Sequence, residues 1–117
     1  MVMRYTVTIS PGVIDKLDQQ EQYLAVKASP QVAERYIDGL LAFLDGLDTF
    51  PERGHPRDDL VSGLRISGYK KSASIAIVVQ KPYVLVVGVF FGGENYESEL
   101  RQLNLQTIDP QELIEQH

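Results

Sequence analysis

Basic and aromatic side chains that could bind an anion gather in one short stretch of this sequence. Arg65 precedes Tyr69, Lys70 and Lys71. A patch of this kind could contact nucleic acid or an acidic protein surface. Lysines on an edge strand also commonly prevent unwanted strand pairing, so a structural interpretation stays open beside the functional one. Tyr69 is either a packed aromatic residue of a β-hairpin or a binding anchor.

Side chains that could transfer a proton are scarce. General acid–base catalysis needs a group that exchanges protons near neutral pH, and histidine is the usual one. His55 lies in a proline-rich stretch and His117 is the last residue, so neither falls in a predicted strand. The carboxylates Glu94, Glu97 and Glu99 have no neighbouring histidine that would indicate a metal site. We therefore predict no catalytic residues, no metal and no cofactor.

Composition limits the class of protein. The chain has 117 residues, 44% of them hydrophobic, which is typical of one globular domain. No apolar run reaches the roughly 18–20 residues that span a membrane. The net charge of −5 disfavours nucleic acid as the main partner, and the absence of cysteine excludes a disulfide framework. We expect a cytoplasmic protein that binds neither a membrane nor nucleic acid directly.

Two serine–proline pairs mark the starts of two helices. Ser10-Pro11 and Ser29-Pro30 each combine an N-cap with a proline at the first helical position. The two helices have almost no linker, so they must form an antiparallel hairpin. Before them, residues 3–9 alternate with a period of two, which predicts a strand with one face toward water. The predicted apolar face comprises Ile14, Leu17, Leu24, Ala25 and Ala28 in the first helix and Ala33, Tyr36, Ile37, Leu40, Leu41, Leu44 and Leu47 in the second.

A loop rich in proline, glycine and charge follows the second helix, with the sequence PERGHPRDDL at residues 51–60. Pro51 and Pro56 end the helix, and Gly54 permits a turn that other residues make with difficulty. Two interpretations stay open for the loop: a structural connection, or direct contact with a partner. Its charged residues, which we expect to be solvated or paired locally, are Arg53, Arg57, Asp58 and Asp59.

Three strands are predicted after this loop, around residues 60–66, 73–79 and 83–91. The turns between them are short, which indicates an antiparallel meander. The order β-α-α-β-β-β predicts an α+β fold, with the helix hairpin packed on a small, mainly antiparallel sheet and a C-terminal helical segment. We expect a single domain over residues 1–104, followed by a tail, residues 105–117, that could form a short helix.

The strand at residues 83–91 is apolar at nearly every position, which predicts burial on both faces. The helix hairpin can cover only one of them. We expect Val84, Val86 and Phe90 to need a second cover. That cover is either another polypeptide or residues 94–104, which place Tyr96, Leu100 and Leu103 on one side.

Several strings of this sequence resemble one family. SPQVAERYIDGLLAFLDGLDTFPERGHPRDDL, GLR at 63–65, YKKSASIAIVV at 69–79 and GVFFGGENYESEL at 88–100 occur in the order found in the ParE/RelE superfamily, which includes the ParE-like plasmid-stabilisation toxins of bacterial type II toxin–antitoxin systems. The resemblance is collinear over residues 3–100. It implies a toxin that inhibits DNA gyrase by binding, without an active site of its own. It also implies a protein antitoxin that neutralises the toxin in a hetero-oligomer.

The resemblance leaves two alternatives open, because one stretch departs from the family pattern. ParE-like proteins often carry H-G-R-R-D where this chain has Phe91-Gly92-Gly93-Glu94-Asn95. Phenylalanine cannot transfer a proton, which counts against a RelE-like, ribosome-dependent mRNA endonuclease. The missing arginines are compatible with a non-toxic member that binds only the antitoxin. The residues we expect at a target- or antitoxin-binding surface are Arg65, Tyr69, Lys70, Lys71, Phe91, Gly93, Glu94, Asn95 and Tyr96.

Overall fold

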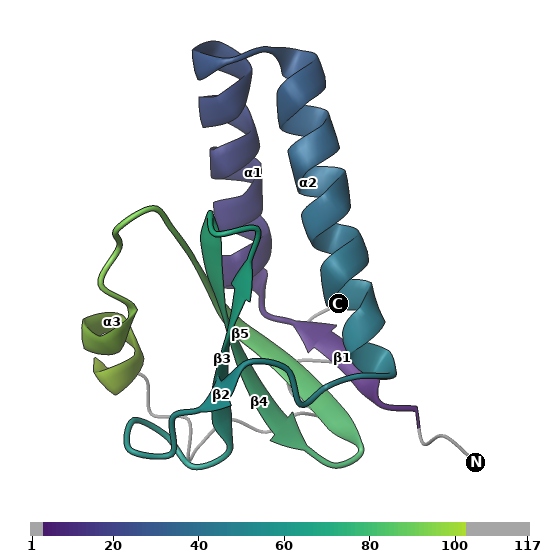
Figure 1. The fold of residues 1–117 in the computed structure, drawn as a ribbon, viewed down its shortest axis with the longest axis vertical. Coiled ribbons are helices and arrows are strands. Elements are labelled where there is room, and N and C mark those ends of the chain that lie inside the picture. Colours follow the sequence, from purple (N-terminus) through teal and green to yellow (C-terminus); the bar gives the residue numbers. More distant parts are fainter. Residues whose placement is uncertain (1–3, 103–117) are drawn as a thin grey trace.

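The computed structural model describes residues 4–102, and it confirms the predicted order of helices and strands (Figure 1). One short strand inside the 51–60 loop was not predicted. The predicted tail helix within residues 105–117 lies outside the described residues. The elements are β1 (Thr6–Ile9), α1 (Pro11–Lys27), α2 (Pro30–Asp45), the 3₁₀ turn η1 (Gly46–Asp48), β2 (His55–Pro56), β3 (Leu64–Tyr69), β4 (Ala73–Gln80), β5 (Tyr83–Phe91) and α3 (Tyr96–Gln102).

The two long helices begin where the serine–proline pairs predict. The Ser10 hydroxyl accepts a hydrogen bond from the Val13 amide at 3.4 Å, and the Ser29 hydroxyl accepts one from the Val32 amide at 3.1 Å. Each serine thereby caps its helix at an amide of the first turn, and the Val13 amide also donates to the Ser10 carbonyl at 3.0 Å. The helices run antiparallel, as Figure 1 shows, and their joined ends project beyond the sheet.

The predicted helix face is correct for α2 except at Leu41, and it is partly wrong for α1. Five predicted α2 and η1 positions are buried, whereas Leu41 is 38% exposed. In α1, Val13 and Leu17 are buried and Ile14 is 40% exposed. Val13 precedes Leu17 by four positions and therefore shares its face, whereas the predicted Leu24 and Ala25 are half-buried and Ala28 is exposed. The five buried positions are Ala33, Ile37, Leu40, Leu44 and Leu47.

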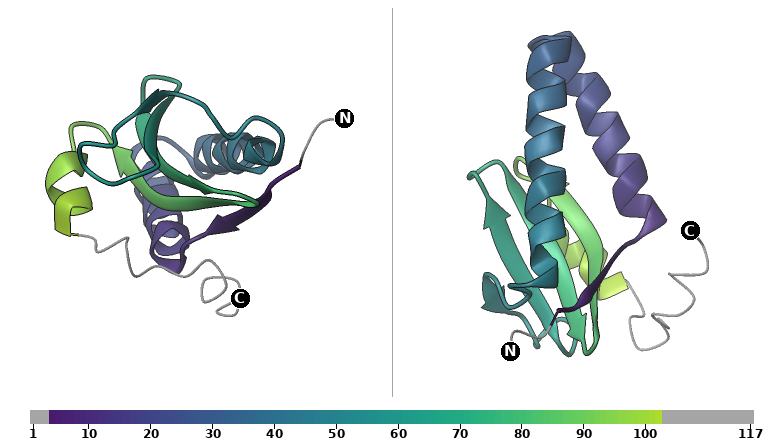
Figure 2. Two further views of the ribbon diagram at one scale, coloured as in Figure 1. Left: turned by 90° about the horizontal axis from the view of Figure 1, so that it is seen from below. Right: turned by 90° about the vertical axis from the view of Figure 1, so that its right-hand side faces the viewer.

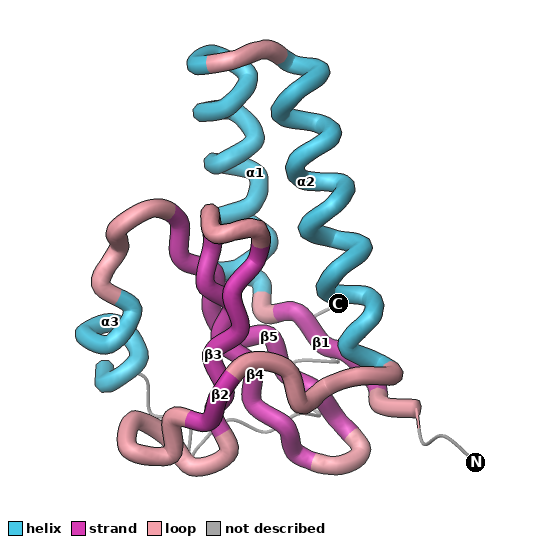
Figure 3. Tube along the Cα trace, in the orientation of Figure 1, coloured by secondary structure: helices cyan, strands magenta, loops and turns pink. Residues whose placement is uncertain are grey.

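The five strands form one sheet in the order β1-β5-β4-β3-β2 (Figure 3). β1 runs parallel to β5, and the remaining neighbours are antiparallel, as the predicted meander requires. α1 and α2 pack on one face of this sheet and α3 packs on the other. In Figure 1 and in the left view of Figure 2, the strands lie between α2 and α3.

A β-bulge decides which residues of β5 face the helix hairpin. Ala76 of β4 pairs with Gly88 but Ile77 pairs with Val86, so Val87 is an extra residue. An extra residue reverses the alternation of side chains beyond it. Val84 and Val86 therefore belong to the core under the hairpin, and our prediction that they need a second cover was wrong.

The second face of β5 is covered by α3. Leu85 and Phe90 lie there, and Leu100 of α3 is fully buried against them. The Tyr96 ring packs on the Phe90 ring at a centroid distance of 5.9 Å. These contacts confirm that residues 94–102 provide the cover, while Leu103 lies outside the described residues.

The segment around β1 has the exposed face that its alternation predicts at Arg4 and Thr6, but not at Thr8. Thr8 is only 4% exposed, and its neighbour in the parallel register, Leu85, is 1% exposed. A period of two separates the faces of a strand but does not reveal that one polar position on the outer face is covered. Met3 lies outside the described residues. Within residues 4–102, no helix combines the length and hydrophobicity that crossing a membrane requires.

Candidate functional site

Two lysines form the turn between β3 and β4. Lys70 and Lys71 have φ angles of 49° and 57°, in the left-handed region that residues with side chains rarely adopt. The Tyr69 carbonyl closes the turn by accepting a hydrogen bond from the Ser72 amide at 2.9 Å. Both lysines are exposed, and neither forms a salt bridge with any residue in the range 4–102. The turn therefore carries two exposed lysines, and the ammonium group of Lys70 lies 5.5 Å from the centre of the Tyr69 ring.

Tyr69 belongs to the core and not to this surface. Its side chain is 7% exposed. Its ring makes an edge contact with Tyr36 at 5.9 Å and a tilted contact with Phe43 at 5.4 Å. Of our two interpretations, the packed hairpin aromatic fits this geometry, because the ring is not accessible to a partner.

Arg65 lies at the other end of β3 from the lysine turn. Its Nε donates to the Arg53 carbonyl at 3.1 Å and its Nη2 donates to the Gly54 carbonyl at 3.1 Å. An extended strand rises about 3.3 Å per residue, so the five steps from Arg65 to Lys70 separate them by roughly 16 Å. The three basic residues therefore do not form one patch, and Arg65 anchors the loop after α2.

The lysine turn lies beside the turn that follows β5. Phe91 pairs with Ala73, and the Gly92 amide donates to the Ser72 carbonyl at 3.4 Å. Gly93 and Asn95 are exposed at this turn, and the Asn95 side chain accepts a hydrogen bond from the Ser98 amide at 3.3 Å, which caps α3. The structure thus brings together Lys70, Lys71 and residues 91–96, but not Arg65, and the buried Tyr69 ring lies 5.5 Å from the Lys70 ammonium.

Glu94 fixes this second turn to α1. Its carboxylate accepts hydrogen bonds from Lys16 Nζ and from the Phe91 amide, each at 2.7 Å. Burial raises the pKa of Glu94, but these two hydrogen bonds outweigh it and hold the pKa below its ordinary value of 4.5. The Lys16 ammonium also lies 4.7 Å from the centre of the Phe90 ring. Sequence reasoning missed Lys16, because nothing local marks a helical lysine that reaches a turn 78 positions away.

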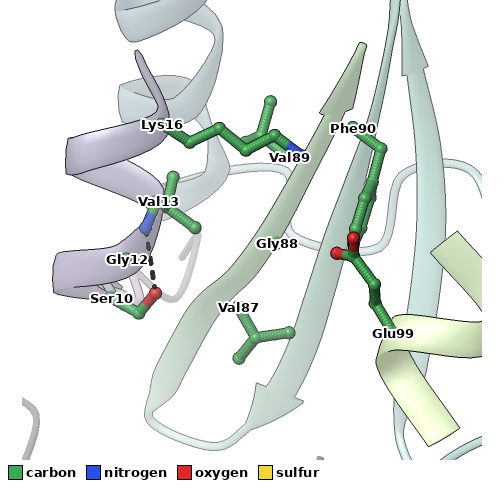
Figure 4. Close-up of a pocket in the computed structure, with 9 residues that line it drawn as sticks. All are labelled: Ser10, Gly12, Val13, Lys16, Val87, Gly88, Val89, Phe90 and Glu99. Atoms are coloured by element: carbon green, nitrogen blue, oxygen red, sulfur yellow. Dashed lines mark hydrogen bonds between the residues drawn. The ribbon is translucent and has the colours of Figure 1, made fainter. Parts of the chain in front are cut away.

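A pocket of about 290 Å³ lies beside this contact, between α1, β5 and α3 (Figure 4). In Figure 4, Lys16 extends from α1 toward β5, and Glu99 of α3 reaches toward Phe90. The Ser10 hydroxyl in its wall already caps α1. The pocket combines apolar walls with two charged groups and holds no paired nucleophile and base. Its lining residues are Ser10, Gly12, Val13, Lys16, Val87, Gly88, Val89, Phe90 and Glu99.

Arg57 joins the 51–60 loop to α3. Its Nε and Nη2 donate to both oxygens of Asp59 at 2.9 Å, and its Nη1 donates to Tyr96 Oη at 3.2 Å and to Glu97 at 3.1 Å. The hydrogen bonds to Asp59 raise the pKa of Arg57 and lower the pKa of the Asp59 carboxyl. The predicted local pairing is confirmed, and the bond to Glu97 extends it to α3.

The structure adds no acid–base group to this surface. His55 is exposed in β2, where it pairs with Ile66. His117 lies outside the described residues. Within residues 4–102, no three His, Cys, Asp or Glu side chains stand close enough to hold a metal ion. The arrangement is suited to binding a protein surface through exposed cations, a rigid turn and an adjacent apolar pocket.

Comparison with known proteins identifies the family of this chain. Residues 7–96 match the family described as the ParE toxin of the type II toxin–antitoxin system parDE. A solved structure described as a chromosomal ParDE toxin–antitoxin system from P. aeruginosa has a similar fold, with a TM-score of 0.67 and 14% sequence identity over 76% of this chain and 97% of that chain. A search of curated proteins finds no significant match. Because the family match extends from β1 to the first residue of α3, this chain belongs to the ParE toxin family of type II toxin–antitoxin systems.

Proposed function

We propose that this toxin acts in the cytoplasm by binding DNA gyrase, and that a cognate antitoxin neutralises it. The family match supports a toxin of the parDE type. The geometry supports binding over catalysis, because the exposed groups near residues 91–96 are two lysines and a glycine-containing turn. A toxin that only binds needs rigid surface groups and no proton donor at its site.

One observation carries the choice of surface: the Gly92 amide donates to the Ser72 carbonyl. This bond places the lysine turn against the segment where ParE-like proteins often carry arginines. Here Gly93 and Glu94 stand at those arginine positions, and Glu94 is already held by Lys16. Lys70 and Lys71 therefore supply the positive charge that the substituted segment lacks. We propose Lys70, Lys71, Gly93 and Asn95 as the contact surface, with Phe91, Glu94 and Tyr96 supporting it.

The first test is controlled expression of this chain in a bacterial host, with the neighbouring small open reading frame supplied separately. We expect growth arrest, induction of the DNA-damage response, and rescue by the neighbour. Purified toxin should also inhibit supercoiling by purified gyrase. The double substitution Lys70→Gln/Lys71→Gln should weaken this inhibition at least tenfold. Lys27→Gln/Lys81→Gln removes the same charge from two other exposed positions and should leave inhibition unchanged.

Two results would overturn the gyrase proposal. Growth arrest without gyrase inhibition, accompanied by cleavage of ribosome-bound mRNA, would establish the endonuclease alternative. Normal growth at confirmed soluble expression, with the antitoxin still bound, would establish a non-toxic binding protein. The second alternative has support in the structure, because the Phe91 ring packs 6.4 Å from the Tyr36 ring and Glu94 is paired with Lys16.

A further inference from the structure

A second surface combines the last turn of α2 with the loop that follows it. The guanidinium carbon of Arg53 is 5.0 Å from the centre of the Phe43 ring and 5.8 Å from that of Phe50. Phe43 is half-buried, whereas Phe50 is 63% exposed. A large aromatic side chain left in water beside an arginine is typical of the residues that dominate protein interfaces.

The Arg53 side chain has no polar partner within residues 4–102. Its Nε is buried and makes no hydrogen bond. The two other arginines of this region have polar partners: Arg57 binds Asp59 and Glu97, and Arg65 donates to two carbonyl groups. Guanidinium groups match carboxylates with a planar pair of donors, and stacking on aromatic rings holds that plane in place. Because the Nε is buried, the donors left for a partner are the two Nη groups of Arg53, beside the rings of Phe43 and Phe50.

The backbone under Arg53 is held rigidly. Arg65 donates to the carbonyl groups of Arg53 and Gly54, and β2 pairs with β3 immediately afterwards. Gly54 has a φ angle of 72°, and its backbone packs so closely on β3 that an added Cβ would lie 2.6 Å from the Ile66 carbonyl carbon. A site on a rigid backbone loses little conformational entropy when it binds.

We propose that Arg53, Phe43 and Phe50 form a docking site for an acidic segment of a protein partner. A carboxylate of the partner binds the Arg53 guanidinium, and an adjacent apolar side chain packs on Phe50. The net charge of −5 disfavours a nucleic acid, with one negative charge on every phosphate, more than a peptide segment that brings a single carboxylate next to an apolar side chain. The site contains neither Lys70 nor Lys71, although Phe43 packs on the Tyr69 ring beside the lysine turn, and this inference does not depend on the proposed gyrase binding.

The test uses a displayed library of random twelve-residue peptides, selected on the immobilised full chain. We expect enrichment of Asp or Glu next to a large apolar residue. Synthetic copies of the selected peptides should bind at least tenfold more weakly to Arg53→Gln and Phe50→Ala. Arg53→Lys should lose affinity severalfold, because lysine keeps the charge and lacks the planar pair of donors. Arg35→Gln, at an exposed arginine of α2, is the matched control and should bind as the unaltered chain does.

Urea denaturation of each variant separates loss of binding from loss of folding. If Arg53→Gln is unstable, the peptide affinity of Arg53→Lys tests the same contact. Selection without carboxylate enrichment, or equal peptide binding by Arg53→Gln, would overturn the proposal. So would the absence of any peptide that binds above background. A twelve-nucleotide single-stranded DNA whose binding requires Arg53, with no peptide binding, would assign the site to nucleic acid instead.

Discussion

Within residues 4–102, three glycines have a positive φ: Gly54, Gly63 and Gly92. Of the three glycine-to-alanine substitutions, we expect Gly54→Ala to destabilise the protein most. Its φ of 72° is unfavourable for a residue with a side chain, which costs about 1–2 kcal/mol. The added Cβ would also lie 2.6 Å from the Ile66 carbonyl carbon and 2.7 Å from the Ser67 Cα, and closer still to the Ile66 oxygen. Because these are backbone atoms, the loop must move away from β3.

Moving the loop breaks the hydrogen bonds from Arg65 to the carbonyl groups of Arg53 and Gly54. Hydrogen bonds to charged groups contribute about 1.5–3 kcal/mol each, and partial exposure of Arg65 reduces that value. Together with the φ cost, Gly54→Ala should lower the free energy of unfolding by roughly 3–5 kcal/mol. In a domain of this size, that loss lowers Tm by more than about 12 °C.

Two other glycines separate the contributions. Gly92 has a φ of 60° and open space around it, so Gly92→Ala carries only the φ cost of about 1–2 kcal/mol. Gly93 has neither a positive φ nor a close neighbour, so Gly93→Ala should be neutral or stabilising by up to about 1 kcal/mol. Urea denaturation followed by far-UV circular dichroism measures all three variants. If Gly54→Ala costs no more than Gly92→Ala, the close packing of the loop on β3 is not what makes glycine necessary there.

Three further predictions concern the core, the Lys16 contact and α3. Gly39→Ala should destabilise the protein, because the added Cβ in α2 would lie 2.7 Å from Tyr69 Oη. In a Tyr69→Phe background the same substitution should instead stabilise it by about 1 kcal/mol, because alanine has the higher helix propensity. Thermal unfolding measures both differences. Glu94 has a lowered pKa, so its contribution to stability is present above pH 4.5 and is lost as the pH falls through the folded-state pKa. Glu94→Gln should therefore have a lower free energy of unfolding than the unaltered chain at pH 7. The urea denaturation curves of the two proteins should converge at low pH. A difference in unfolding free energy that does not change with pH would exclude a stabilising charged contact with Lys16. Leu100→Ala should lower the free energy of unfolding by about 2–5 kcal/mol, because the Leu100 side chain is fully buried. Amide hydrogen exchange that becomes faster only in α3 would show that this helix separates from the sheet without global unfolding.

The local features of the sequence determined the helices and most of the strands. Ser10-Pro11 and Ser29-Pro30 fix the helix starts, because a serine side chain and a proline ring act on the backbone within three residues. The apolar stripe of α2 fixes its buried face, and the continuous apolar run of β5 fixes its burial on both sides. These signals depend on neighbours along the chain, so no tertiary information was needed to read them.

The tertiary structure decided which side chains meet. The bulge at Val87 moved Val84 and Val86 to the hairpin face, and no periodicity in β5 reveals an extra residue opposite β4. The predicted basic patch is divided, because Arg65 and Lys70 lie at opposite ends of β3. The Tyr69 ring is buried, because it packs on the Tyr36 and Phe43 rings of α2.

The Lys16–Glu94 pair and the unpartnered guanidinium of Arg53 likewise depend on contacts between distant segments. The sequence by itself therefore determined the family, the elements and the supply of exposed charge. Which of those charges are already paired, and which remain available to a partner, depends on packing between elements, and only the folded chain decides it.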